Sequence, residues 1–294
     1  MKPKYYMILA MLLFGSIGLF VRYIDMGSGQ IALIRGALGS FVLIAAGMLI
    51  HRKITWCAVR KNFLLLILSG AGLGFSWIFL FEAYDYTTIA NATLSCYFAP
   101  LFVVLASPFI LKEHLSLVKA FCIFGAVAGM FLVVGFDISG GNFLFIGIGY
   151  GLFAAALYAM VIIINKFFKD LTGLEAAIFQ LFFSTLVVLP YVAFTQGFDF
   201  TGVSSLSWFL VVILGIVHTG VGYLIYFSAM QKLPGQTVAS LCYIDPVSAI
   251  IMSGVVLGET LGLVQVLGAV LILGATFISD RYGNKKFTKF PKSS

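Results

Sequence analysis

One stretch of the chain occurs twice, and this internal repeat constrains the fold more than any other feature. The segment that ends at Glu113 recurs without a gap as a segment that ends at Glu259, at a displacement of 146 positions. The coinciding pairs include Phe81 with Phe227, Cys96 with Cys242, Tyr97 with Tyr243 and Pro100 with Pro246. A repeat about half as long as the chain predicts two halves of similar structure.

Composition indicates that these halves lie in a membrane. Hydrophobic residues make up 61% of the chain and charged residues 10%. Ten apolar runs are each long enough to cross a bilayer, and backbone groups in lipid must be satisfied within a helix. The sequence predicts an all-α integral membrane protein with ten transmembrane helices at 5–24, 31–50, 62–82, 89–111, 118–136, 143–164, 174–194, 207–228, 235–257 and 262–280.

The distribution of basic residues predicts the orientation. Ten spans place both termini on one side, and the basic loop and tail residues, from Lys2 to Lys292, all fall on that side. By the positive-inside rule the termini are cytoplasmic in a multi-pass protein of the inner (plasma) membrane. The net charge of +7 is thus a topological signal and gives no reason to expect nucleic acid as a partner.

The repeat and the span count together predict an inverted architecture. Five spans form each half, and an odd number makes the second half enter the membrane from the opposite side. We expect a first five-helix repeat at 1–137, a second at 143–281, and a basic tail at 282–294. In inverted-repeat transporters, the substrate site lies between the halves near the middle of the membrane.

Several short motifs carry a resemblance to a known family. They are Phe-Gly-Ser at 14–16, Tyr-Phe-Ala-Pro at 97–100, Tyr-Ile-Asp-Pro at 243–246, Leu-Lys-Glu at 111–113 and Leu-Gly-Glu at 257–259. With them, essentially the whole chain resembles the EamA-type family of the drug/metabolite transporter superfamily. The resemblance implies an inner-membrane exporter whose central cavity is lined mainly by the first, third, fourth, sixth, eighth and ninth helices. It leaves the substrate open, because the family moves amino acids, other metabolites, nucleotide precursors and cationic drugs.

Asp245 is the most informative single residue. It is the eleventh residue of the ninth predicted span, where a carboxylate costs about 2.5–3.5 kcal/mol even on the mildest insertion scale. One interpretation is that Asp245 binds a cationic group of the substrate or exchanges a proton. The other is that neighbouring hydroxyl groups hold it and it only supports the helix. Pro100 and Pro246 each remove a helical hydrogen bond, which predicts a kink in both the fourth and the ninth span.

Further polar and aromatic residues within spans are candidates for the same site. His218 is a candidate protonatable residue, although a single buried histidine is also commonly held by a nearby hydroxyl. We expect Asp245 and His218 to face one central cavity with several aromatic residues. The other candidates are Trp77, Tyr97, Tyr158, Tyr223, Tyr243, Asn91, Ser95 and Ser240, of which the last three also suit contacts between helices.

Three charged residues are candidates for helix junctions or gates. Arg35 lies near an outer region that holds Asp25, Glu82 and Asp85, so ion pairing is expected there, with attraction of a substrate carboxylate as the alternative. Glu113 and Glu259 end corresponding spans. Each is expected to cap the helix that follows, or to brace a gate, on opposite faces of the membrane.

These features favour a transporter over an enzyme. The sequence contains no catalytic motif, no phosphate-binding loop and no ligand-spaced cysteines or histidines, so we expect no cofactor and no metal. The predicted function is secondary export of small polar metabolites, such as amino acids or related amines, by alternating access. The alternatives are proton-coupled export of lipophilic cations or drugs, and a channel. The expected partners are the substrate, the lipid bilayer and protons as a candidate coupling ion, with the chain a monomer or weak homodimer.

Overall fold

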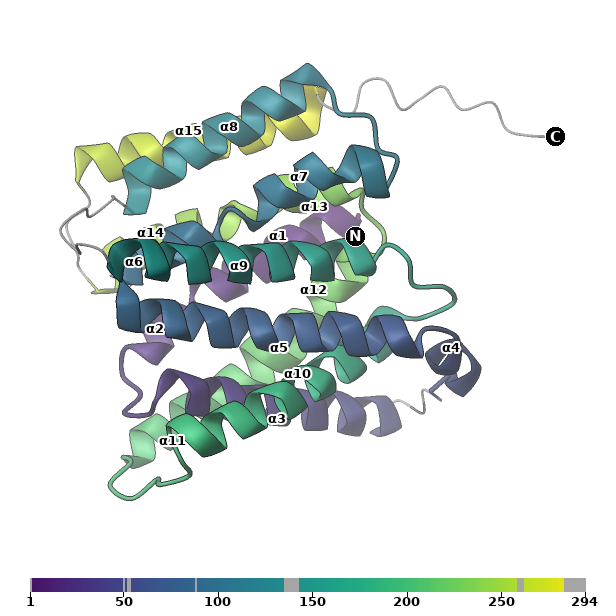
Figure 1. Cartoon of the computed structure of the whole chain (residues 1–294), viewed down its shortest axis with the longest axis vertical. Coiled ribbons are helices and arrows are strands. Elements are labelled where there is room, and N and C mark those ends of the chain that lie inside the picture. Colours follow the sequence, from purple (N-terminus) through teal and green to yellow (C-terminus); the bar gives the residue numbers. More distant parts are fainter. Residues whose placement is uncertain are drawn as a thin grey trace.

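The chain is a bundle of long helices arranged side by side (Figure 1). The computed structural model describes residues 2–49, 51, 54–87, 89–134, 143–257 and 262–282, and no strand occurs among them. The helices are α1 (Pro3–Gly15), α2 (Ile17–Val21), α3 (Ser28–Leu49), α4 (Trp56–Lys61), α5 (Phe63–Tyr86), α6 (Ile89–Cys96), α7 (Ala99–Ile110), α8 (Leu117–Val134), α9 (Phe143–Ile164), α10 (Gly173–Thr195), α11 (Ser205–Ile213), η1 (Leu214–Val221), α12 (Gly222–Met230), α13 (Gly235–Cys242), α14 (Ile244–Leu257) and α15 (Leu263–Tyr282).

Length and composition make this a membrane protein. Eight helical segments of the described chain are long and apolar enough to cross a bilayer. Two shorter apolar helices, Leu117–Val133 and Leu263–Ser279, lie where the fifth and tenth spans are predicted. The number of spans therefore stays a prediction. The start of α1 and the end of α15 lie on the same side of the bundle, which we call the terminal side (Figure 1).

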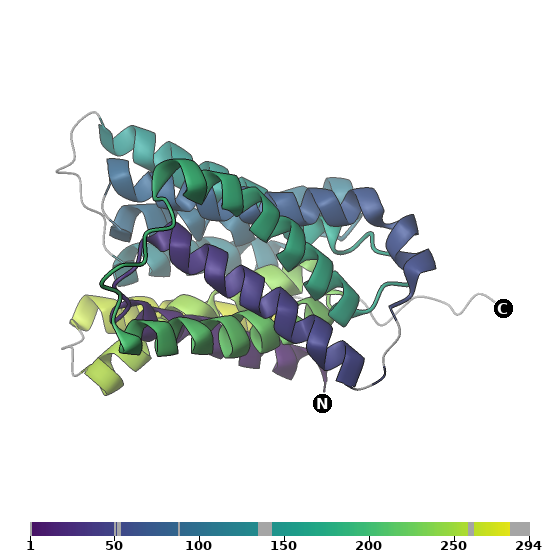
Figure 2. The same cartoon turned by 90° about the horizontal axis from the view of Figure 1, so that it is seen from below.

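Two of the helix pairs that the repeat relates are also neighbours in space. α8 and α15 pack together at one end of the bundle (Figure 1), while α3 and α10 run side by side and cross the other helices obliquely (Figure 2). The first pair meets at two glycines. A Cβ added to Gly268 would lie 2.6 Å from the Gly129 carbonyl oxygen, so a larger residue would push the helices apart.

The helix boundaries repeat at the displacement seen in the sequence. α6 and α13 begin at Ile89 and Gly235 and each has eight residues. α8 and α15 begin at Leu117 and Leu263, at the same interval. The secondary structure thus follows the sequence repeat at these helices.

Several spans are interrupted rather than continuous. α6 gives way to α7, and α13 to α14, about one turn before Pro100 and Pro246, where the sequence predicts kinks. Two further interruptions were not predicted. The first span breaks at Ser16, between α1 and α2, and the eighth passes through the π-helix η1. π-helical turns are rare and are often found at functional sites.

Candidate transport site

Two helix breaks bring Tyr97 and Asp245 together. Tyr97 lies between α6 and α7, and Asp245 lies in the first turn of α14, just after the break at Tyr243. The Tyr97 hydroxyl is placed to donate a hydrogen bond to the Asp245 carboxylate. α1 approaches the same turn through Gly15, where an added Cβ would lie 2.7 Å from the Asp245 carbonyl oxygen. Asp245 is therefore next to the interrupted regions of the first, fourth and ninth spans.

Aromatic side chains from three more helices continue this region. The hydroxyls of Tyr158 and Tyr226 are 2.8 Å apart. The Phe14 ring centroid lies 5.0 Å from that of Tyr223 and 5.6 Å from that of Tyr226, and Trp77 meets Tyr223 edge-on at 6.3 Å. We define the central cluster as Phe14, Arg35, Trp77, Tyr97, Tyr158, Tyr223, Tyr226 and Asp245.

Arg35 supplies the positive charge of the central cluster. Its guanidinium carbon lies 4.8 Å from the centroid of the Trp77 ring, a cation–π arrangement. Its Nε is buried and has no hydrogen-bond partner among the described residues. Tyr223 lies within electrostatic range of both Arg35 and Asp245. The cluster thus contains a cation and an anion with an aromatic side chain in range of both.

The expected ion pair of Arg35 is not formed. In the part of the chain that the structure describes, no salt bridge joins Arg35 to Asp25, Glu82 or Asp85. The guanidinium lies against Trp77 instead, because packing of α3 near α5 brings an aromatic face to it. Arg35 therefore has no carboxylate partner among the described residues.

The polar members of the cluster keep accessible surface. Arg35, Tyr97, Tyr158 and Asp245 are half-buried, whereas Trp77 is buried. Tyr226 is fully buried, and Tyr223 nearly so. Both charged residues of the cluster are thus among its more accessible members. A common central cavity stays a prediction.

His218 joins the break in the first span to the π-helix. Its Nε2 lies 2.8 Å from Ser16 Oγ, and the same hydroxyl donates to the Leu13 carbonyl at 2.8 Å. When Ser16 donates to Leu13, Nε2 must carry the hydrogen toward Ser16. The His218 and Phe20 ring centroids are 4.8 Å apart in a T-shaped arrangement, the Ile213 backbone lies within reach of the imidazole, and the charge of Arg35 reaches it. A hydroxyl therefore holds this histidine between two irregular helical segments.

The remaining polar candidates lie at helix contacts outside the central cluster. Ser95 donates to the Asn91 carbonyl at 2.8 Å, and α9 approaches Ser95 closely at Gly151. Ser240 lies 3.0 Å from Ser279 Oγ and so connects α13 with α15. The side chain of Tyr243 is buried, and its hydroxyl has no partner in the described chain. Ser95 and Ser240 thus lie at contacts between helices, and Asn91 Nδ2 donates to Thr87 Oγ1 at 3.2 Å.

Glu113 binds the N-terminus of a helix in the other half of the chain. Its two carboxylate oxygens accept hydrogen bonds from the backbone N–H groups of Gly235, at 2.6 Å, and Gln236, at 3.1 Å. Gly235 permits this approach, since an added Cβ would lie 2.6 Å from Leu111 Cδ1. The capped helix is α13, not the following α8 as expected; the first turn of α8 is bound by Ser116 Oγ. Glu259 lies outside the described residues.

Lys166 binds the other end of the segment that joins α12 to α13. Its ammonium donates to the carbonyl of Met230, the last residue of α12, and to that of Leu233 at 2.5 Å. Burial lowers the pKa of Lys166 to about 8, although the charge of Glu113 acts in the opposite direction. We define the α13 clasp as Glu113, Lys166 and the segment they bind, 230–236. The clasp joins the two halves on the terminal side.

Known proteins share this fold and sequence pattern. A sequence profile of the EamA-like transporter family matches residues 2–135 and 145–279. The chain belongs to this family. It is 27% identical over 272 residues to Uncharacterized transporter YxxF of Bacillus subtilis (strain 168), covering 88% of this chain and 85% of the relative. It is also 27% identical to mouse Solute carrier family 35 member G1, over 84% of this chain and 69% of that protein.

The fold also matches a solved structure. A crystal structure superposes with a TM-score of 0.83 at 21% identity, over 94% of this chain and 96% of the other. Family and relatives together make this EamA-like protein a multi-pass membrane transporter.

Sequence reasoning left two contributors out of the candidate site, Phe14 and Lys166. Phe14 belongs to the Phe-Gly-Ser motif, which is a signal that could have found it. Lys166 had no such signal. Its role depends on contact with the carbonyl ends of α12, which only the folded chain shows.

Proposed function

We propose that this EamA-like protein is a secondary exporter of small polar metabolites, with amino acids and related amines as the first candidates. Its two halves, 1–137 and 143–281, would be inverted repeats that move relative to each other. The matching boundaries of α6 with α13 and of α8 with α15 support this arrangement. The basic residues on the terminal side favour cytoplasmic termini in the inner membrane.

The two charges of the central cluster carry the proposal. A zwitterion would place its carboxylate on Arg35, whose fork of donors suits planar carboxylates, and its ammonium on Asp245. Tyr223, in range of both charges, would lie along the bound molecule. The Tyr97 hydroxyl is placed to donate to Asp245, and a carboxylate has further lone pairs that could accept from a substrate donor.

Lipophilic cations are the second candidate substrates. The tyrosines near Asp245 provide aromatic faces that attract cations. Arg35 argues against this candidate, because a like charge in the same cluster repels a substrate that carries only a positive charge. The same repulsion is absent for a zwitterion, whose negative end neutralises Arg35.

The α13 clasp supports alternating access. It ties the connection between α7 and α8, in the first half, to α13, in the second half. The repeat pairs Glu113 with Glu259 and Gly235 with Ile89, so we propose a corresponding contact on the opposite face. Opening one side would require release of one clasp while the other forms.

Transport by purified protein in proteoliposomes distinguishes the candidates. Vesicles loaded with an unlabelled amino acid mixture should accumulate labelled amino acids by counterflow, with and without an imposed pH gradient. Tetraphenylphosphonium serves as the lipophilic cation in parallel vesicles. Counterflow of amino acids alone supports the first candidate, and accumulation of tetraphenylphosphonium alone supports the second. Ion currents without counterflow would contradict both and indicate a channel.

A further inference from the structure

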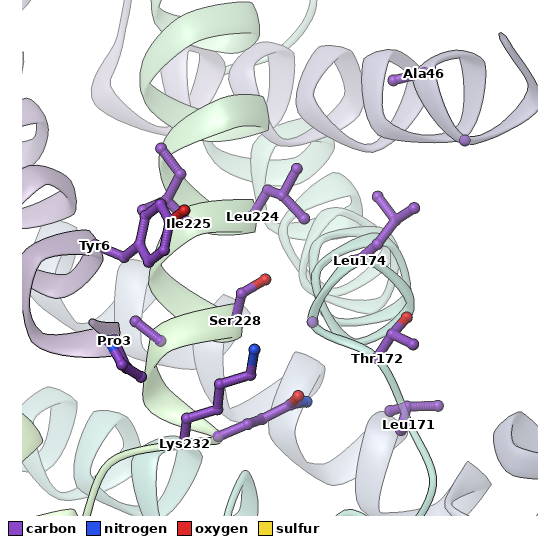
Figure 3. A pocket seen from close by; sticks show the side chains of 14 residues that line it. Pro3, Tyr6, Ala46, Leu171, Thr172, Leu174, Leu224, Ile225, Ser228 and Lys232 are labelled. Atoms are coloured by element: carbon purple, nitrogen blue, oxygen red, sulfur yellow. The ribbon is translucent and has the colours of Figure 1, made fainter. Parts of the chain in front are cut away.

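A pocket opens on the terminal side, away from the central cluster. It has a volume of about 630 Å³ and lies between the beginning of α1, the end of α3, the beginning of α10 and the end of α12 (Figure 3). This volume would hold a drug-sized molecule. None of its described lining residues belongs to the central cluster or to the candidate residues from the sequence. We call it the α12 pocket.

The polar groups of the α12 pocket are mainly donors. The Lys232 ammonium and the Ser228 hydroxyl point into it (Figure 3), and Gln231 contributes to its lining. Gln231 Nε2 is buried and has no hydrogen-bond partner among the described residues. None of the described lining residues is acidic. A lysine and a hydroxyl in a pocket without an acidic lining residue favour an anionic ligand.

The acidic residue closest in sequence to the residues that line the pocket already has hydrogen-bond donors of its own. Glu175 lies outside the described lining of the pocket, and its carboxylate accepts from the Thr55 N–H at 2.6 Å, the Thr172 N–H at 2.8 Å and the Thr172 hydroxyl at 2.9 Å. These donors disperse its charge. Lys232 therefore gives the α12 pocket its net charge.

The rest of the α12 pocket is apolar. Leu224 and Ile225 line it from α12, and Leu174 lines it from α10 (Figure 3). α10 and α12 touch where a Cβ added to Gly173 would lie 2.6 Å from Ser228 Cα, which fixes the floor of the pocket. The ligand must therefore combine an anionic group with apolar carbon chains.

We infer that the α12 pocket binds an anionic phospholipid of the leaflet on the terminal side. The phosphate would meet Lys232 and Ser228, and the start of the acyl chains would lie along Leu224 and Leu174. The position of the pocket at the ends of four spanning segments is the depth at which lipid headgroups lie. A lipid here would link helices of both halves. This inference does not depend on the transported substrate.

Lipid binding to the delipidated full-length protein in detergent tests the inference. The probes are phosphatidylglycerol, phosphatidylcholine and glycerol 3-phosphate, with lipid retention followed by native mass spectrometry and stability by melting temperature. The wild-type protein should retain phosphatidylglycerol at about tenfold lower concentration than phosphatidylcholine. Lys232→Gln should abolish this preference. Lys169→Gln, which removes an exposed charge on the same side but outside the pocket, should keep it.

A second variant fills the α12 pocket with a larger side chain. Ala46→Phe, on α3, should reduce retention of both lipids while the melting temperature without lipid stays within a few degrees of wild type. Should it fail to fold, Ser228→Ala replaces it and should weaken phosphatidylglycerol several-fold. An equal loss of phosphatidylglycerol retention in Lys232→Gln and Lys169→Gln would show a general effect of surface charge and would contradict a lipid site in the α12 pocket. Full competition by glycerol 3-phosphate would overturn the lipid and indicate a soluble anion.

Discussion

Asp245 and Arg35 are each costly where they lie, and their surroundings offset only part of the cost. The carboxylate of Asp245 receives a hydrogen bond from Tyr97. Arg35 has the face of Trp77 but a buried Nε without a partner among the described residues. A polar ligand that satisfies both groups would recover the missing interactions. Hydrogen-bonding groups that lack a full set of partners are therefore expected of a binding site rather than of a structural ion pair.

The first prediction concerns Asp245→Asn. The substitution keeps the shape and most hydrogen bonds but deletes the charge, so transport should fall by about 10- to 100-fold, the equivalent of one charged hydrogen bond. Counterflow in proteoliposomes measures the loss, and melting temperature checks folding. Asp199→Asn, in an exposed connection where the carboxylate binds Thr201, is the matched control and should transport normally. Full activity of Asp245→Asn would assign this aspartate to structure alone.

The second prediction separates the substrate classes at Arg35. Arg35→Gln removes the charge that would bind a carboxylate, so the KM for a zwitterionic substrate should rise about tenfold or more. Simple amines that lack a carboxylate should be transported as well as before, or better, because the like charge is gone. Equal effects on both classes of substrate would contradict a direct role in carboxylate binding.

The third prediction concerns the pKa of Lys166, which lies outside the spanning helices. Its folded pKa of about 8 is below the ordinary value of 10.5. Between these values the unfolded chain binds the proton and the folded chain does not, so this group makes the protein more stable as pH rises through that interval. Glu113→Gln should lower the pKa further, because the carboxylate favours the charged amine. NMR of the labelled lysine Cε measures the titration midpoint of Lys166 in the wild type and in the variant. An unchanged midpoint in Glu113→Gln would contradict an electrostatic interaction between Glu113 and Lys166.

Single residues were predictable to different degrees. Asp245 could be singled out because a charge within an apolar run is conspicuous in the sequence alone. Arg35 was assigned to ion pairs near the outer face, whereas the structure places it over Trp77. The sequence separation of these two residues hides the contact, which depends on how α3 and α5 pack. The role of the central cluster in binding remains a proposal.

Broken helices are the elements that shape the site. Tyr97 and Asp245 both lie at breaks that precede a proline, where the backbone turns away from a regular helix. The prolines are visible in the sequence. The breaks at Ser16 and in η1 carry no proline, and His218 connects them through Ser16. Such contacts between distant segments override local helix preference, so they could not be predicted.

The fourth prediction tests the α13 clasp. Glu113→Gln removes a charge from the N-terminus of α13 and weakens two hydrogen bonds, which should destabilise the closed terminal side by about 1–3 kcal/mol. Cysteines placed near the clasp should then react faster with a membrane-impermeant thiol reagent applied from the terminal side. Glu82→Gln, on α5, is the control and should leave this rate unchanged. Identical rates in Glu113→Gln and wild type would exclude a gating role.

At the scale of the whole molecule, hydropathy made the helical membrane fold predictable, because long apolar runs have few alternatives to spanning helices. The two segments now seen as α8 and α15 begin within one residue of the predicted fifth and tenth spans, at Leu117 and Leu263. Hydropathy could not predict how the two halves pack against each other. The apolar face of a helix can contact lipid tails or another helix, and both are similarly apolar.

The fifth prediction concerns topology. In a cysteine-free background that retains transport, Lys169→Cys should be labelled only from the cytoplasm and Thr201→Cys only from outside. The two sites follow successive spanning helices, α9 and α10, at opposite ends of the bundle. Impermeant maleimide applied to intact cells and to inverted vesicles measures both. Labelling of both residues from one side would contradict the arrangement.

The glycine contact between α8 and α15 has a consequence for how such a chain can be assembled. Each helix ends its own half, and the backbones meet directly at Gly129 and Gly268. This contact needs no covalent continuity between the halves. Two separately expressed polypeptides, 1–134 and 143–294, should therefore find each other in a membrane and co-purify. A bulky residue at Gly129 should prevent their association more severely than it disturbs the intact chain, where the tether keeps the local concentration high.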